Sequence, residues 1–72
     1  GSGDAEVYYN RGDAYGELEE YSAALSDFDK AIELDPEYVM AYVSRGSVHG
    51  LLNDFPSAVS DANKAIELDP DS

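Results

Sequence analysis

The residue types of a hydrolase triad occur close together in this sequence, and they are the first candidates for chemistry. Ser47, His49 and Asp54 would supply a nucleophile, a base and an acid that orients the base. The serine lacks the glycine-flanked turn that exposes such a nucleophile, and no segment resembles an oxyanion loop. The sequence therefore predicts no catalytic role for these three residues.

Closely spaced carboxylates are the second candidates, because they could bind calcium or transfer protons. Asp27/Asp29 and Glu19/Glu20 are such pairs. No window has the alternating acids, central glycine and terminal glutamate of a calcium loop. One histidine without cysteine cannot build a His/Cys metal cluster, and no glycine-rich loop has the residues that bind phosphate. We therefore expect a protein that is not an enzyme and uses no metal or cofactor.

The charge of the chain restricts its partners. The 72 residues include 16 acidic and four basic side chains, giving a net charge of −12. So few basic residues argue against nucleic acid and against anionic membranes as partners, and no apolar stretch is long enough to span a bilayer. A basic or apolar protein or peptide is the expected partner. The compartment is unknown; an intracellular, cytoplasmic one is the most compatible.

An internal repeat organises the chain. Residues 30–36 recur identically as residues 64–70, an offset of 64 − 30 = 34 positions. Apolar residues at spacings of three and four predict four helices, over about residues 7–18, 21–34, 39–52 and 56–68. The expected inward face of the first helix carries Val7, Tyr8, Arg11, Ala14, Tyr15 and Leu18.

The turn between the last two helices has its own signals. Asn53 suits a left-handed position after a helix, and Pro56 suits the first turn of the next one. Asp54 is the expected N-cap, a role that Ser57 could share.

Small residues recur where the helices of each pair should cross. These residues are Gly12 with Ala24, and Gly46 with Ala58. We expect them to let the helix backbones approach closely.

Together these features resemble tetratricopeptide repeats, which are helix–turn–helix units of 34 residues. The matching positions are Tyr8, Gly12, Tyr15, Ala24, Phe28, Ala31 and Pro36, then Tyr42, Gly46, Ala58, Ala65 and Pro70. The resemblance implies an all-α solenoid of two hairpins with four antiparallel helices, in which residues 5–38 are the first repeat and 39–72 the second. Residues 1–4 are interpreted as a disordered remnant of an expression tag.

The sequence departs from the family pattern at five positions. Arg11 and Arg45 replace a leucine, and Glu19 replaces a glycine at the turn. His49 replaces a tyrosine and is therefore expected to pack in or near the core. Ala62 replaces an aromatic residue.

The two arginines suggest structural ion pairs. Arg11 and Arg45 lie on faces that should be buried, and Asp27 and Asp61 recur at matching sites of the second helices. A buried charge needs a partner, so we expect the pairs Arg11–Asp27 and Arg45–Asp61. The alternative is that the arginines bind an acidic ligand.

The resemblance also implies where a partner would bind. In this family the first helix of each pair lines a concave groove, so the chain is expected to be a protein-interaction scaffold. The candidate groove residues are Glu6, Tyr9, Asn10, Asp13, Glu17, Met40, Val43, Ser44, Ser47 and Leu51.

Self-association is the alternative function. Two repeats without a polar cap leave apolar surface on the last helix, because solenoids bury their core by stacking. The candidate residues are Val59, Ala62, Ile66 and Leu68. The chain would then be a self-assembling structural unit, either an excised or an engineered repeat, that forms homo-oligomers or stacks.

Overall fold

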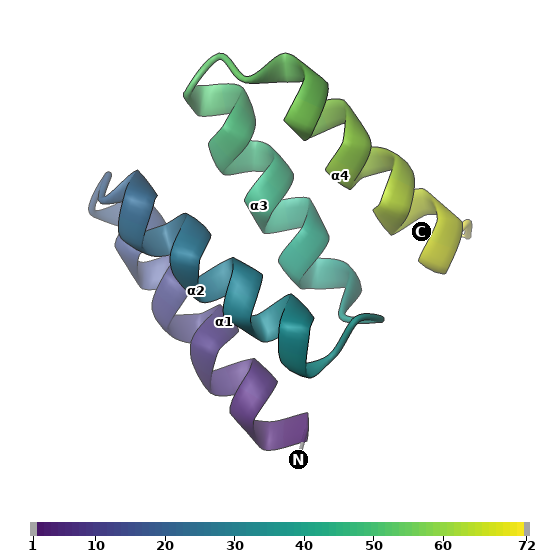
Figure 1. Cartoon of the computed structure of the whole chain (residues 1–72), viewed down its shortest axis with the longest axis horizontal. Helices are drawn as coiled ribbons and strands as arrows, with labels where there is room; N and C mark the ends of the chain where they lie inside the picture. Colours follow the sequence, from purple (N-terminus) through teal and green to yellow (C-terminus); the bar gives the residue numbers. More distant parts are fainter. Residues whose placement is uncertain (1, 72) are drawn as a thin grey trace.

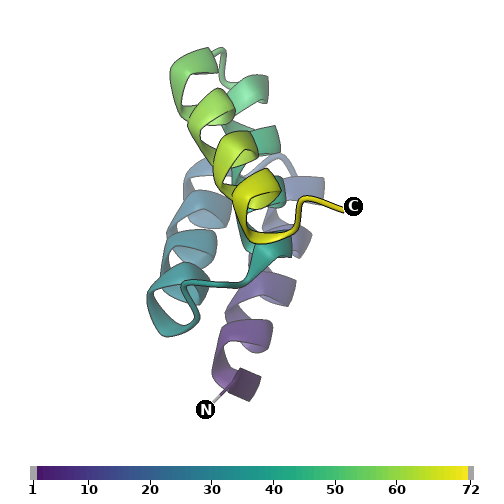
Figure 2. The same cartoon turned by 90° about the vertical axis from the view of Figure 1, so that its right-hand side faces the viewer.

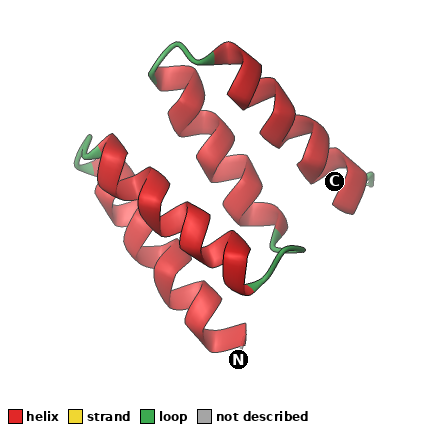
Figure 3. Cartoon of the chain, in the orientation of Figure 1, coloured by secondary structure: helices red, strands yellow, loops and turns green. Residues whose placement is uncertain are grey.

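The fold is four helices arranged as two antiparallel hairpins. The computed structural model describes residues 2–71, and within them helices are joined only by short loops (Figures 1 and 3). The helices are α1 (Ser2–Glu17), α2 (Tyr21–Leu34), α3 (Val39–Leu51) and α4 (Phe55–Leu68). This arrangement is the predicted all-α repeat fold.

Helix α1 begins earlier than predicted. Gly1 lies outside the described residues, and residues 2–4 form the first turn of α1. Asp4 places a negative charge in this turn, where the positive end of the helix dipole favours it.

Glycines set the distance between the helices of each hairpin. A Cβ on Gly12 would lie 2.8 Å from Cε1 of Phe28, so α1 sits directly on the aromatic ring. A Cβ on Gly46 would lie 3.1 Å from Cβ of Asp61 and 3.4 Å from the carbonyl oxygen of Ala58. Both glycines are therefore at the helix crossings, as expected.

The core lies in the first hairpin and at its boundary with α3. Ala24, Phe28 and Val48 form a buried cluster, with Tyr9 and Tyr15 among the half-buried residues around it. Helix α4 buries only Asp61 and Ala65, and its packing is confined to α3 (Figure 2). The second hairpin is thus the less filled of the two.

The predicted inward face of α1 is partly wrong. Val7 is 65% exposed, whereas Ala41, its counterpart in α3, is fully buried at 0%. Ala14 and Leu18 are exposed as well. Helix α3 packs on α2, and this packing covers Ala41. Leu52, the counterpart of Leu18, is 47% exposed as well, so this packing does not account for every position.

Both hairpin turns place a residue in the left-handed region. Asn53 has φ 66°, as predicted, and Glu19 has φ 62°. Asparagine tolerates this conformation, whereas for glutamate the contact between Cβ and the backbone costs about 1–2 kcal/mol.

Glu19→Gly is therefore expected to stabilise the protein by about 1 kcal/mol, since glycine removes the Cβ contact. Urea denaturation followed by circular dichroism measures the change. Asn53→Gly is the matched control and should gain less. An equal gain in stability at both positions, or a loss of stability for Glu19→Gly, would show that the backbone conformation of Glu19 is not strained.

Asp54 caps helix α4. Its Oδ1 accepts a hydrogen bond from the backbone N–H of Ser57 at 3.3 Å, so Ser57 is the donor and not the cap. Hydrogen bonds from Ser57 lower the pKa of Asp54 below its ordinary value, with a smaller contribution from His49.

This cap should make α4 sensitive to acid. Because the folded-state pKa is lowered, the carboxylate stabilises the fold above about pH 3.9, its unfolded pKa. That stabilisation is lost as pH falls through the folded pKa. An asparagine cap does not titrate, so between pH 6 and pH 3 the melting temperature of Asp54→Asn should rise relative to the parent. A difference in melting temperature that stays constant over this range would contradict the role of the charge.

Candidate functional site

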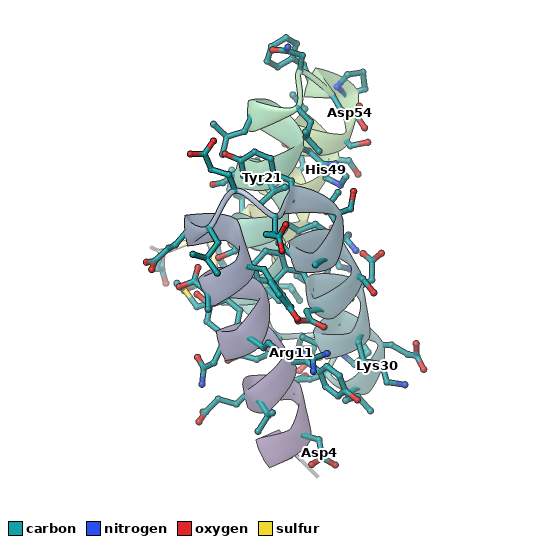
Figure 4. All side chains as sticks on the ribbon, turned by 90° about the vertical axis from the view of Figure 1, so that its left-hand side faces the viewer. Asp4, Arg11, Tyr21, Lys30, His49 and Asp54 are labelled. Atoms are coloured by element: carbon teal, nitrogen blue, oxygen red, sulfur yellow. The ribbon has the colours of Figure 1, made fainter. Side chains whose placement is uncertain are left out.

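Each hairpin contains the arginine–aspartate pair that the sequence suggested. Arg11 donates from Nε and Nη2 to the two carboxylate oxygens of Asp27, both at 2.8 Å (Figure 4 labels Arg11). Arg45 donates to Asp61 in the same way, at 2.9 and 2.7 Å. These two-point contacts join α1 to α2 and α3 to α4. Each arginine is already paired with a carboxylate and is therefore not free to bind an acidic ligand.

The two pairs differ in burial, contrary to the expectation that both arginines are buried. The side chain of Arg11 is 59% exposed and that of Arg45 is 23% exposed, while both aspartates are buried. Arg45 is the less exposed of the two because α3 also packs on α2, where Asp29 contacts its guanidinium. The hydrogen bonds that the two arginines donate to their aspartates raise the pKa of both guanidinium groups, which therefore stay charged.

Arg45 makes a third contact that the sequence analysis missed. Its Nη1 donates to Oδ1 of Asp29 in α2, at 2.8 Å, so one guanidinium ties the second hairpin to the first. The counterpart of Asp29 in the second repeat is Asn63, so the comparison of the two repeats does not predict this contact.

A cleft of about 240 Å³ lies where α1, α2 and α3 meet. It brings together half of the predicted groove residues, which are Asp13, Glu17, Ser44, Ser47 and Leu51. Tyr21, Phe28 and Val48 also line it, and none of its lining side chains is basic. The cleft therefore combines an apolar floor with two carboxylates.

The other predicted groove residues lie outside the lining of this cleft. Glu6, Asn10 and Met40 are exposed outside its lining. Tyr9 is half-buried, with its ring 5.2 Å from that of Tyr38 and its hydroxyl 3.4 Å from Oγ of Ser44.

Burial and nearby charge both affect the pKa of Tyr38 in this region. Burial raises the pKa of Tyr38, and the negative charge of Glu6 raises it further. Glu6 therefore contributes negative charge near the contact between Tyr9 and Tyr38.

A second hollow, of about 430 Å³, lies between α3 and α4. Its lining is mostly apolar and includes the groove candidate Val43 together with Ala62 and Ile66 of the self-association set. Val59 and Ile66 are exposed, and Leu68 is half-buried. The proposed self-association residues thus lie on and around the open side of α4.

His49 is half-buried against two carboxylates. Its Nδ1 lies 3.7 Å from Oδ2 of Asp54, and its Nε2 lies 3.9 Å from Oδ2 of Asp61. Figure 4 shows His49 and Asp54 at the end of the molecule opposite Asp4. Ser47 is not among these contacts, so the structure does not assemble the triad that the sequence excluded.

Over residues 2–71, no cluster of three or more histidine, cysteine, aspartate or glutamate side chains could hold a metal ion. In the same residues, no helix has the length and apolar character needed to cross a bilayer.

Comparisons with known proteins agree with this geometry. Two family models described as tetratricopeptide repeat match residues 5–38 and 41–72. A search of curated proteins finds no match. Among solved structures, the crystal structure of MamA is similar, with a TM-score of 0.92 and 30% sequence identity over 97% of this chain. The chain spans 41% of the length of that protein chain.

Proposed function

The chain belongs to the tetratricopeptide repeat family, whose repeats are protein-interaction scaffolds and generally not catalytic, and from this premise we propose that its cleft binds a basic and apolar peptide segment. The supporting observation is the lining of the cleft between α1 and α3. Asp13 and Glu17 line it together with the buried apolar side chains of Phe28 and Val48. Basic side chains would meet the carboxylates, while apolar ones would cover the floor.

The long-range charge favours the same partner. A net charge of −12 attracts a basic segment from a distance, and this attraction weakens as salt screens it. The binding should therefore be faster and tighter at low ionic strength.

Fluorescence anisotropy with synthetic octapeptides tests this proposal. Labelled peptides of alternating leucine and lysine should bind, and peptides of alternating leucine and glutamate should not. Asp13→Lys should weaken binding at least about tenfold, because it replaces an attraction by a repulsion inside the cleft.

Glu33→Lys is the matched control, since it makes the same charge change on exposed α2 surface outside the cleft. It should lower the affinity only slightly. Equal losses for the two variants would show unspecific attraction to an acidic protein and would overturn cleft binding.

Self-assembly through α4 is a second candidate, supported by the exposure of Val59 and Ile66. Covering such apolar surface contributes about 25 cal/mol per Å² before the cost of association. Light scattering over a wide concentration range tests it. A mass that grows with concentration and returns to the monomer in Ile66→Glu supports self-assembly, whereas a monomer at every concentration excludes it.

A further inference from the structure

Gly16 lies in the last turn of α1 and lines the cleft between α1, α2 and α3. It differs from Gly12, because an added Cβ at position 16 would find open space, with no atom of another helix within 4 Å. Its backbone has no positive φ, so an L side chain would not be strained there. Since glycine disfavours a helix, neither packing nor backbone conformation explains its presence.

The position of Gly16 in the helix places it beside two carboxylates. Residues three and four apart are neighbours on a helix surface, so Asp13, Gly16 and Glu17 share one face of α1. All three line the cleft, together with the buried side chains of Phe28 and Val48. The bare backbone at position 16 therefore forms part of an apolar surface in a cleft whose lining carries negative and no positive charge.

A side chain at position 16 would occupy the space that a ligand needs. The cleft has a volume of about 240 Å³, which exceeds the roughly 150 Å³ of an apolar cavity that holds benzene. The cleft is thus large enough for one leucine or aromatic side chain. Because the Cβ direction of Gly16 is open, a larger residue there would project into this volume.

We propose that Gly16 is the specificity-determining residue of the cleft, an inference that rests on the peptide binding proposed above. The absence of its side chain admits one large apolar side chain of the bound peptide. Asp13 and Glu17 favour a lysine or arginine directly beside that side chain. The preferred ligand is therefore a segment in which large apolar and basic residues adjoin, rather than any basic segment.

Gly50 separates this role from a role in the hairpin turn. It has the same position in the second repeat, and its carbonyl oxygen accepts a hydrogen bond from the N–H of Asn53 at 3.0 Å. The carbonyl oxygen of Gly16 accepts one from the N–H of Glu19, also at 3.0 Å. A Cβ on Gly50 would meet nothing within 4 Å either, but Gly50 does not line the cleft. Gly50 is therefore the matched control.

Fluorescence anisotropy of the full chain with two labelled octapeptides tests the role of Gly16. One peptide alternates leucine and lysine and the other alternates alanine and lysine, so they have the same charge and differ in the size of the apolar side chains. The parent should bind the leucine peptide at least about tenfold more tightly, because leucine buries more apolar surface. Gly16→Leu should remove this preference by filling the cleft, while the affinity for the alanine peptide stays within about twofold.

Two further comparisons show that a filled cleft, and not a damaged fold, causes the loss. Gly50→Leu adds the same side chain outside the cleft and should leave both affinities unchanged. Gly16→Ala and Gly50→Ala should each raise the melting temperature by roughly 4 °C, because alanine favours the helix. Only Gly16→Ala should weaken the leucine peptide, by severalfold, so stability and binding should change in opposite directions at this position.

Equal binding of the two peptides by the parent would overturn the role of Gly16. Equal losses of affinity for the leucine peptide in Gly16→Leu and Gly50→Leu would overturn it as well. Asp13→Lys distinguishes this failure from a failure of cleft binding. If Asp13→Lys weakens both peptides while Gly16→Leu weakens neither, the carboxylates bind the peptide and Gly16 does not select it. If neither peptide binds the parent, the proposed function fails and the role of Gly16 fails with it.

Discussion

Asp61→Ala is expected to lower the free energy of unfolding by about 2–3 kcal/mol, clearly more than Asp27→Ala. Removing one partner of a buried ion pair costs about 3–5 kcal/mol when the other charge stays buried. Arg45 is 23% exposed and keeps its contact with Asp29, which places the expected cost below that range. A domain of this length has roughly 4–10 kcal/mol of stability in all, so the loss is a large fraction of it.

Replacing Asp27 by alanine in the first hairpin leaves an arginine that is more exposed to solvent. Arg11 is 59% exposed, so it can regain water when Asp27 is removed. Its pair resembles a surface salt bridge, for which solvent screening leaves a small contribution. The ranking of the two variants thus follows from the different exposure of Arg11 and Arg45, although the sequence around the two aspartates is nearly the same.

Urea denaturation with circular dichroism measures both variants under the same conditions. Should Asp61→Ala fail to fold, Asp61→Asn keeps the shape and one acceptor, and its smaller loss can still be compared with that of Asp27→Asn. Equal losses in the two hairpins, or a larger loss at Asp27, would show that exposure of the arginine does not set the cost.

The helices and the ion pairs could be predicted from the sequence because the residue patterns that indicate them are local or repeated. The spacing of apolar residues predicted four helices, and only the start of α1 lies far from its predicted position. Asn53 and Asp54 predicted the turn between α3 and α4. The pairs Arg11–Asp27 and Arg45–Asp61 could be predicted because each arginine recurs on a face expected to be buried. A buried charge needs a partner, and the aspartates recur at the same spacing.

Features that depend on whether a second hairpin packs against a helix could not be predicted in this way. The period gives Val7 the same role as Ala41, yet only Ala41 is covered. The contact between Arg45 and Asp29 crosses the boundary between the repeats, so comparing positions within one repeat did not reveal it. Ala62 was recognised as a departure, but the sequence did not show that Ala62 and Val43 would line one hollow between α3 and α4.

Gly12→Ala is expected to destabilise the protein by about 1–3 kcal/mol, the usual range for overpacking a core. The new Cβ would lie 2.8 and 3.0 Å from two atoms of the Phe28 ring and 3.1 Å from Cβ of Asp27. A buried ring is rigid, so α1 must move away from α2 to relieve the contact. That movement also lengthens the hydrogen bonds that Arg11 donates to Asp27.

Gly46→Ala is the matched control because its surroundings are more open. The nearest atoms are Cβ of Asp61 at 3.1 Å and the carbonyl oxygen of Ala58 at 3.4 Å, with no aromatic ring among them. A shift of a few tenths of an ångström relieves these contacts, and alanine favours the helix over glycine by about 1 kcal/mol. The net change should therefore be close to zero.

A double variant identifies the ring as the cause. Phe28→Leu alone should destabilise the protein by leaving space in the core, but together with Gly12→Ala the two losses should not add, since the smaller side chain makes room for the new Cβ. Thermal and urea denaturation of the four proteins complete the cycle. Strict additivity would mean that Phe28 does not limit the approach of α1, and the short distance between α1 and α2 would then need another cause, such as the ion pair beside it.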